Sequence, residues 1–259
     1  GRNLAEICRR RFPRPVVWMM WIIAELIAMV TDMAEFLGAA LGFQLLFGMP
    51  LWAGALFTAL ATILILGLER YGFRPLEAAI SAFVGVIALC YLIETLLDKP
   101  HWGSIVRYAV TPQFVDHESI LLAAGILGAT VMPHVIFLHS ALTQGRIRTK
   151  DPRKLTRLYH FQLVDVVIAL GIAGLVNAAM LIMAASTFHR AGFVHIATIE
   201  EAHLTLEPLL GKASSWVFAI SLLASGLSSS AVGTMSGQIV MKGFLRRRIP
   251  LLFRRLITM

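Results

Sequence analysis

The sequence contains little cysteine and few charged residues. Its 259 residues include two cysteines, and Asp, Glu, Lys and Arg together make up 15%. Cys8 falls in a loop and Cys90 in an apolar stretch, so a disulfide between them is not expected, and neither belongs to a metal-spacing motif. The sequence also has no Asn-x-Ser/Thr sequon and no His-Glu-x-x-His run. These absences argue against a disulfide-stapled domain and against an intramembrane zinc protease.

Small and hydroxyl residues gather without forming a catalytic motif. A Gly-x-Ser-x-Gly nucleophile elbow is absent, so the serine-rich stretch 225–230 is interpreted as helix packing. The same interpretation holds for Gly38-x-x-x-Gly42 and Gly233-x-x-x-Gly237, because this spacing lets two helices approach closely. The sequence therefore does not predict an enzyme.

Long apolar runs dominate the chain. Hydrophobic residues make up 58% of it, and the mean hydropathy is +0.76. A run of about 20 apolar residues is long enough to cross a bilayer as a helix. We therefore predict an all-α integral membrane protein that forms one transmembrane domain over residues 1–259. The predicted spans are approximately 16–46, 51–68, 78–97, 120–142, 161–185 and 214–240.

The basic excess predicts membrane topology rather than nucleic-acid binding. When the predicted loops are sorted alternately, nineteen of the 23 Lys and Arg residues fall on one side. The other four are Lys99, Arg107, Arg190 and Lys212. By the positive-inside rule the basic side, which carries both ends of this chain, is cytoplasmic. The lack of sequons favours a bacterial cytoplasmic membrane.

A helix break is predicted inside the span 120–142, at Ala129-Thr130-Val131-Met132-Pro133-His134. Pro133 removes a backbone donor and crowds the Ala129 carbonyl, and lipid cannot bond the carbonyl that is freed. The Met132 sulfur lies three residues further on, so the simplest occupant is a soft or borderline metal cation. Spacing alone leaves open whether Met132 is a ligand or a core residue. His134 adjoins the break, where imidazole can relay protons or lie near a cation.

Three carboxylates share one stripe of the first predicted span, at Glu25, Asp32 and Glu35. Charged groups inside a membrane are costly unless they face water or partners, so the row predicts a polar pathway suited to binding and releasing protons. Ion pairing with Arg residues elsewhere in the bundle is the alternative. Glu94 and Asp165 lie near the ends of their spans, where we expect them to reach toward the loops.

Five motifs together resemble the Nramp family of proton-coupled divalent metal transporters. Thr31–Gly38 is similar to that family's third membrane helix, and Ala129–His134 to its sixth. The remaining similarities are Asn3–Glu6 before helix three, Gly233–Gln238 in helix eight, and the Arg254-Arg255 pair at the start of helix nine. The resemblance covers the whole chain as helices three to eight.

The resemblance implies a fold of two inverted five-helix repeats, with metal bound between the unwound parts of helices one and six. By motif position, the Ala129 carbonyl and the Met132 sulfur would be metal ligands, with His134 beside the site. The residues of the implied proton and salt-bridge network are Glu25, Asp32, Glu35, Arg254 and Arg255. The family's Asp-Pro-Gly-Asn ligand motif of helix one does not occur in this sequence. We therefore expect further helices before Gly1 and after Met259.

The expected function is proton-driven import of Mn²⁺ or Fe²⁺, with Cd²⁺ and Co²⁺ also carried. The expected partners are metal ions, protons and the lipid bilayer, without a permanent cofactor and without nucleic acid. One alternative is a transporter of another solute, such as an amino acid coupled to Na⁺, which the hydroxyls of Ser228–Ser230 would suit. A more distant alternative is a haem or metal oxidoreductase using His134 and His139, although their five-residue spacing places them on different helix faces.

Overall fold

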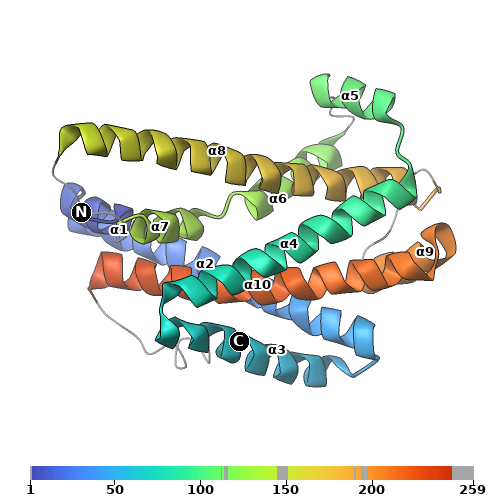
Figure 1. Ribbon diagram of the computed structural model, residues 1–259, viewed down its shortest axis with the longest axis horizontal. Coiled ribbons are helices and arrows are strands. Elements are labelled where there is room, and N and C mark those ends of the chain that lie inside the picture. The colour runs from blue at the N-terminus through green and yellow to red at the C-terminus, as the bar shows by residue number, and fades with distance from the viewer. Residues whose placement is uncertain are drawn as a thin grey trace. The chain divides into compact units, whose positions relative to one another are not determined.

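The computed structural model describes residues 2–111, 113, 116–144, 151–189, 191–193, 196 and 198–246. Within these ranges the regular structure is helical (Figure 1). The chain divides into two compact units. The first unit comprises Gly1–Glu35, His101–Arg146 and Ser229–Met259, and the second comprises Phe36–Pro100 and Ile147–Ser228.

Two long helices contribute to both units. These are α2 (Arg14–Phe47) and α10 (Lys212–Leu245). The other helices of the first unit are α1 (Leu4–Arg11), α5 (Trp102–Val110), α6 (His117–Thr130) and α7 (Pro133–Leu142). The second unit adds α3 (Leu51–Gly67), the 3₁₀ turn η1 (Leu68–Tyr71), α4 (Phe73–Asp98), α8 (Pro152–Met183), the π-helical segment η2 (Ala184–His189) and α9 (Ile199–Leu210).

Among the described residues, five stretches of helix are long and apolar enough to cross a membrane. They are Arg14–Phe47, Arg74–Asp98, His117–Leu142, Arg153–His189 and Lys212–Leu245. The remaining predicted span, 51–68, corresponds to α3, which has 17 residues. At about 1.5 Å per residue it is roughly 25 Å long, shorter than a hydrocarbon core of about 30 Å. The turn η1 continues the helical chain directly from the end of α3.

Local sequence explains where several helices begin. Asn3, Asp116 and Thr198 each cap a helix by accepting a hydrogen bond from a backbone N–H of the first turn. Between α2 and α3, Gly48 has a φ of +66°, a conformation that favours glycine. The chain therefore turns at Gly48 before Pro50 precedes α3.

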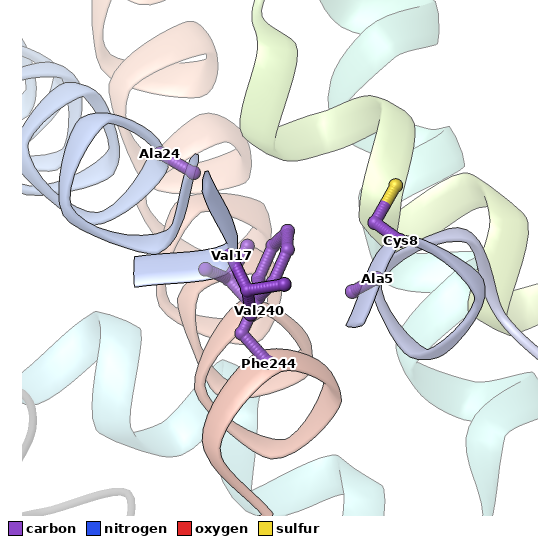
Figure 2. Close-up of a cluster of buried hydrophobic side chains, with 6 residues drawn as sticks. All are labelled: Ala5, Cys8, Val17, Ala24, Val240 and Phe244. Atoms are coloured by element: carbon purple, nitrogen blue, oxygen red, sulfur yellow. The ribbon is translucent and has the colours of Figure 1, made fainter. Parts of the chain in front are cut away.

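In the first unit, α1 packs against α2 and α10 through small and apolar side chains. Figure 2 shows Val17 of α2 against Val240 and Phe244 of α10, with Ala5 and Cys8 of α1 in the same buried cluster. The Leu4 N–H also donates a hydrogen bond of 2.7 Å to Ser140 Oγ, which fastens α1 to α7. Burial raises the pKa of the Cys8 thiol, as expected for a packing residue rather than a reactive one.

In the second unit, α2 and α10 approach at the level of their backbones. A Cβ added at Gly42 would lie 2.8 Å from the Cα of Leu223, and one at Gly226 would lie 2.7 Å from the Cα of Ala39. Gly38 has more room, since its Cβ would lie 3.8 Å from a Leu222 methyl group. Of the predicted pair Gly38 and Gly42, only Gly42 is thus required for the close approach.

Candidate metal centre

The predicted break is present as a gap between α6 and α7. Helix α6 ends at Thr130 and α7 begins at Pro133. Val131 and Met132 between them are extended, with φ and ψ of −99° and 93° and of −89° and 105°. Figure 1 shows α6 and α7 as separate coils joined by this short extended stretch.

Proline chemistry accounts for the position of the gap. The last backbone hydrogen bond of α6 is donated by the Val131 N–H to the Leu127 carbonyl, at 2.9 Å. The first backbone hydrogen bond of α7 is donated by the Val135 N–H to the Met132 carbonyl, at 3.1 Å. Pro133 has no N–H for the Ala129 carbonyl, the bond that a continuous helix would make. A backbone oxygen and a thioether thus come from the same interrupted turn.

The three predicted site residues of this segment differ in burial. Ala129 is exposed, Met132 is half-buried, and His134 is fully buried at the start of α7. Among the described residues, no three His, Cys, Asp or Glu side chains are grouped so as to hold a metal ion. The donor atoms that the break itself offers are the Ala129 carbonyl oxygen and the Met132 sulfur.

The carboxylate stripe of α2 faces α10 within the first unit. Asp32 is 3% exposed, and Ser230 Oγ donates a hydrogen bond of 3.1 Å to its Oδ1. A Cβ added at Gly233 would lie 3.2 Å from Glu35 Oε2 and 3.4 Å from Asp32 Oδ1. Gly233 therefore leaves the space that the two carboxylates occupy. One oxygen of Glu25 is also buried.

Ser230 contacts the candidate residue Asp32, and the sequence interpretation does not anticipate this contact. The stretch 225–230 was assigned to packing, yet the Ser230 hydroxyl contacts Asp32. The available signal is the run Gly226, Ser230, Gly233 and Thr234, which places small and hydroxyl residues on one face of an apolar helix. Such a face suits a helix that packs against buried acids.

Other predicted residues have different outcomes. Arg254 and Arg255 lie outside the described residues. The expectation that Glu94 reaches toward a loop is wrong, because its side chain is fully buried. The reason is that α8, α9 and α10 pack over the face of α4 that carries Ile87 and Tyr91, and Glu94 continues this face. Asp165 is exposed on α8.

These features define a class of protein. The chain is a bundle of membrane-length helices in which one helix is broken in mid-span and buried carboxylates lie between two others. Discontinuous helices with polar groups at the break are the mark of secondary transporters built from inverted repeats.

The chain belongs to the Nramp family. Residues 1–259 match the family described as "Natural resistance-associated macrophage protein-like". The divalent metal cation transporter MntH of Burkholderia ambifaria is 54% identical over 258 residues, which is 100% of this chain and 58% of that protein. MntH of Deinococcus radiodurans is 53% identical over 259 residues, which is 100% of this chain and 59% of that protein. The chain thus spans less than two thirds of the length of these relatives.

Solved structures show the same fold. A crystal structure of a mutant manganese transporter from Eremococcus coleocola matches with a TM-score of 0.86 and 35% identity, over 98% of this chain and 56% of that one. A second structure of that transporter, in complex with an aromatic bis-isothiourea substituted compound, matches with a TM-score of 0.85 and 36% identity, over the same shares. The chain therefore has the helical fold of a part of an inverted-repeat Nramp transporter.

Proposed function

We propose that this chain is part of a proton-coupled importer of divalent transition metal ions, Mn²⁺ or Fe²⁺ as physiological cargo and Cd²⁺ or Co²⁺ as further substrates. The observation that carries the proposal is the break between α6 and α7, which presents the Ala129 carbonyl and the Met132 thioether in mid-span. The relatives that are described as divalent metal cation transporters support it. Their descriptions favour metal over an amino acid as the solute and over haem chemistry.

The thioether gives a physical basis for selectivity. Ca²⁺ and Mg²⁺ prefer all-oxygen cages, whereas a sulfur ligand is relatively better tolerated by softer ions. Met132 would thus lower the relative affinity for the hard cations, while the Ala129 carbonyl serves either kind of ion. The remaining ligands of the cargo would come from the part of the transporter that corresponds to helix one of the family.

Protons would move through the carboxylates of α2. The Ser230 hydroxyl donates a hydrogen bond to Asp32, and Gly233 leaves room for the carboxylates of Asp32 and Glu35. A polar partner lowers the cost of an acid within the membrane. We assign proton exchange to Asp32, Glu35 and Glu25. His134 would act beside the metal, and the Arg254-Arg255 pair would balance the charge of the carboxylates.

The proposed setting is the cytoplasmic membrane of a bacterium. The five membrane-length helices support a multi-pass protein. The bias of Lys and Arg toward one set of loops places both ends of this chain in the cytoplasm. Uptake would then be directed from the side with few basic residues to the basic side.

Replacing Met132 tests the metal site. In the complete protein, Met132→Ala should keep part of its Cd²⁺ uptake but lose much of its discrimination against Ca²⁺, because only oxygen ligands remain. The measurement is Cd²⁺ uptake into proteoliposomes with and without excess Ca²⁺. Met19→Ala is a matched control, since Met19 is 55% exposed on α2. An unchanged preference for Cd²⁺ over Ca²⁺ in Met132→Ala would reject the ligand role.

A further inference from the structure

Glu94 is a buried acid that the proposed proton route through α2 does not use. It lies in α4, four residues before the helix ends at Asp98. Its side chain is 0% exposed, and within the described part of the chain neither carboxylate oxygen has a hydrogen-bond partner. Ile87, Tyr91 and Glu94 follow one another at helical spacing, so Glu94 continues the buried face of α4.

The surroundings of Glu94 belong to the second unit and are largely apolar. Tyr91 and Ile87 pack with Met183 of α8, Leu206 of α9 and Ala224 of α10. Helix α4 also packs against α8. The face of α4 that Glu94 continues is therefore covered by α8, α9 and α10.

The titratable groups around this cluster come from two helices. On α4 they are Cys90 and Tyr91, which interact electrostatically with Glu94, and Asp98 one turn further on. On α9 the group is His203, whose ring centroid lies 6.3 Å from that of Phe218 at the edge of the cluster. Burial lowers the pKa of His203, so it contributes a neutral ring near neutral pH. From α10, the Ser221 hydroxyl is hydrogen-bonded to Tyr91.

Among the described residues, an ionised Glu94 would be a fully buried carboxylate with no hydrogen-bond partner for either oxygen. Burying such a group is far more costly than burying the neutral acid. The arrangement therefore accommodates Glu94 with its proton bound. Tight apolar packing does not require an acid, since an amide or a methionine would fill a similar volume. What an acid adds is the capacity to give up a proton when water reaches it.

Access to Glu94 is limited by a contact at the end of α4. Asp98 accepts hydrogen bonds from the hydroxyls of Ser186 and Thr187, with the Thr187 bond at 2.7 Å. Both hydroxyls belong to η2, the π-helical end of α8. Single π-helical turns are frequent at functional sites. The contact joins α4 to the end of α8 one turn beyond Glu94, at the end of the span.

We propose that Glu94 is a further proton-exchanging site of the transporter, closed in this structure by the packing of α4 against α8 and by the contact of Asp98 with Ser186 and Thr187. When the two helices part, water enters, Glu94 releases its proton to that water, and it takes up a proton again before the helices close. The proposal rests on the proposed function, because it adds a second proton site to a proton-coupled transporter.

The variant Glu94→Gln separates exchange from packing, since the amide keeps the shape but binds no exchangeable acid proton. In proteoliposomes of the complete protein, with Mn²⁺ as the probe, we expect Glu94→Gln to retain Mn²⁺ binding. Its Mn²⁺-driven proton influx should fall to at most half of the unsubstituted value, and its uptake should depend less on external pH. Glu207→Gln is the matched control, because Glu207 is exposed on α9 of the same unit. Equal influx and equal pH dependence in Glu94→Gln and the unsubstituted protein would overturn the proposal.

A second variant and a second readout cover the remaining outcomes. Glu94→Met should fold and show the same loss of proton influx as Glu94→Gln, whereas normal influx in Glu94→Met would overturn the proposal. Infrared spectroscopy of the purified protein should show a carbonyl band of a protonated carboxylic acid that is missing from Glu94→Gln, and identical spectra would also overturn it. If the unsubstituted protein showed no Mn²⁺-driven proton influx, the proposed function would fail, and the infrared band would then decide on Glu94 alone.

Discussion

The backbone contact between α2 and α10 predicts that two similar glycines respond in opposite ways to the same substitution. Gly38 and Gly42 lie one turn apart on α2, and both face α10 within the second unit. Gly42→Ala places a methyl group 2.8 Å from both the Cα and the Cβ of Leu223, while Gly38→Ala places one 3.8 Å from a Leu222 methyl group. The first is an overlap with backbone, and the second is an ordinary contact.

The magnitude follows from that difference. A carbon at 2.8 Å must move by roughly 0.6 Å or more to reach ordinary contact, and backbone atoms of a long helix move only with the helix. Overpacking of this kind costs about 1–3 kcal/mol. Both substitutions gain up to about 1 kcal/mol of helix propensity, so this gain cancels when they are compared. Gly42→Ala should therefore be less stable than Gly38→Ala by about 1–3 kcal/mol.

Thermal unfolding of the complete protein in detergent measures this difference. At roughly 2–4 °C per kcal/mol for a chain of this size, Gly42→Ala should melt a few degrees below Gly38→Ala. Gly38→Ala should match or exceed the unsubstituted protein. Equal melting temperatures for the two variants would refute the reasoning, since they would show that α10 yields to the added methyl group without cost.

Two further predictions concern polar contacts within single units. Ser140→Ala removes the acceptor of the Leu4 N–H, so the free energy that holds α1 against α7 should fall by about 1 kcal/mol. The amides of α1 should then exchange hydrogen faster. Unchanged exchange would show that this hydrogen bond does not hold α1 in place. Asp98→Asn replaces a carboxylate acceptor by an amide, which should weaken its hydrogen bonds to Ser186 and Thr187. The backbone amides of 184–189 should therefore exchange hydrogen faster. Exchange equal to that of the unsubstituted protein would show that Asp98 does not hold this segment.

The helix break could be predicted from the sequence because its cause is local. Pro133 lacks an N–H in any context, so the position of the gap follows from one residue and from the apolar length around it. The carboxylate stripe was predictable for the same reason, since helical spacing alone places Glu25, Asp32 and Glu35 together. Both features depend on neighbours within a few turns of chain.

The partners of those residues could not be predicted. Ser230 lies 198 positions from Asp32 in the sequence, and only the register of α10 against α2 brings them together. The burial of Glu94 has the same origin, because it depends on how α8, α9 and α10 cover one face of α4. Spacing identifies the face of a helix but not the helix that will cover it.

Burial of both native thiols has a practical consequence. Cys8 and Cys90 are 8% and 6% exposed, and the raised pKa of Cys8 leaves little of its reactive thiolate near neutral pH. Within this chain, a cysteine introduced at a surface position would therefore react with a maleimide reagent before Cys8 or Cys90. Single engineered thiols along 129–134 would then report, by their rates of alkylation, which side of the membrane the gap opens to at a given moment of turnover.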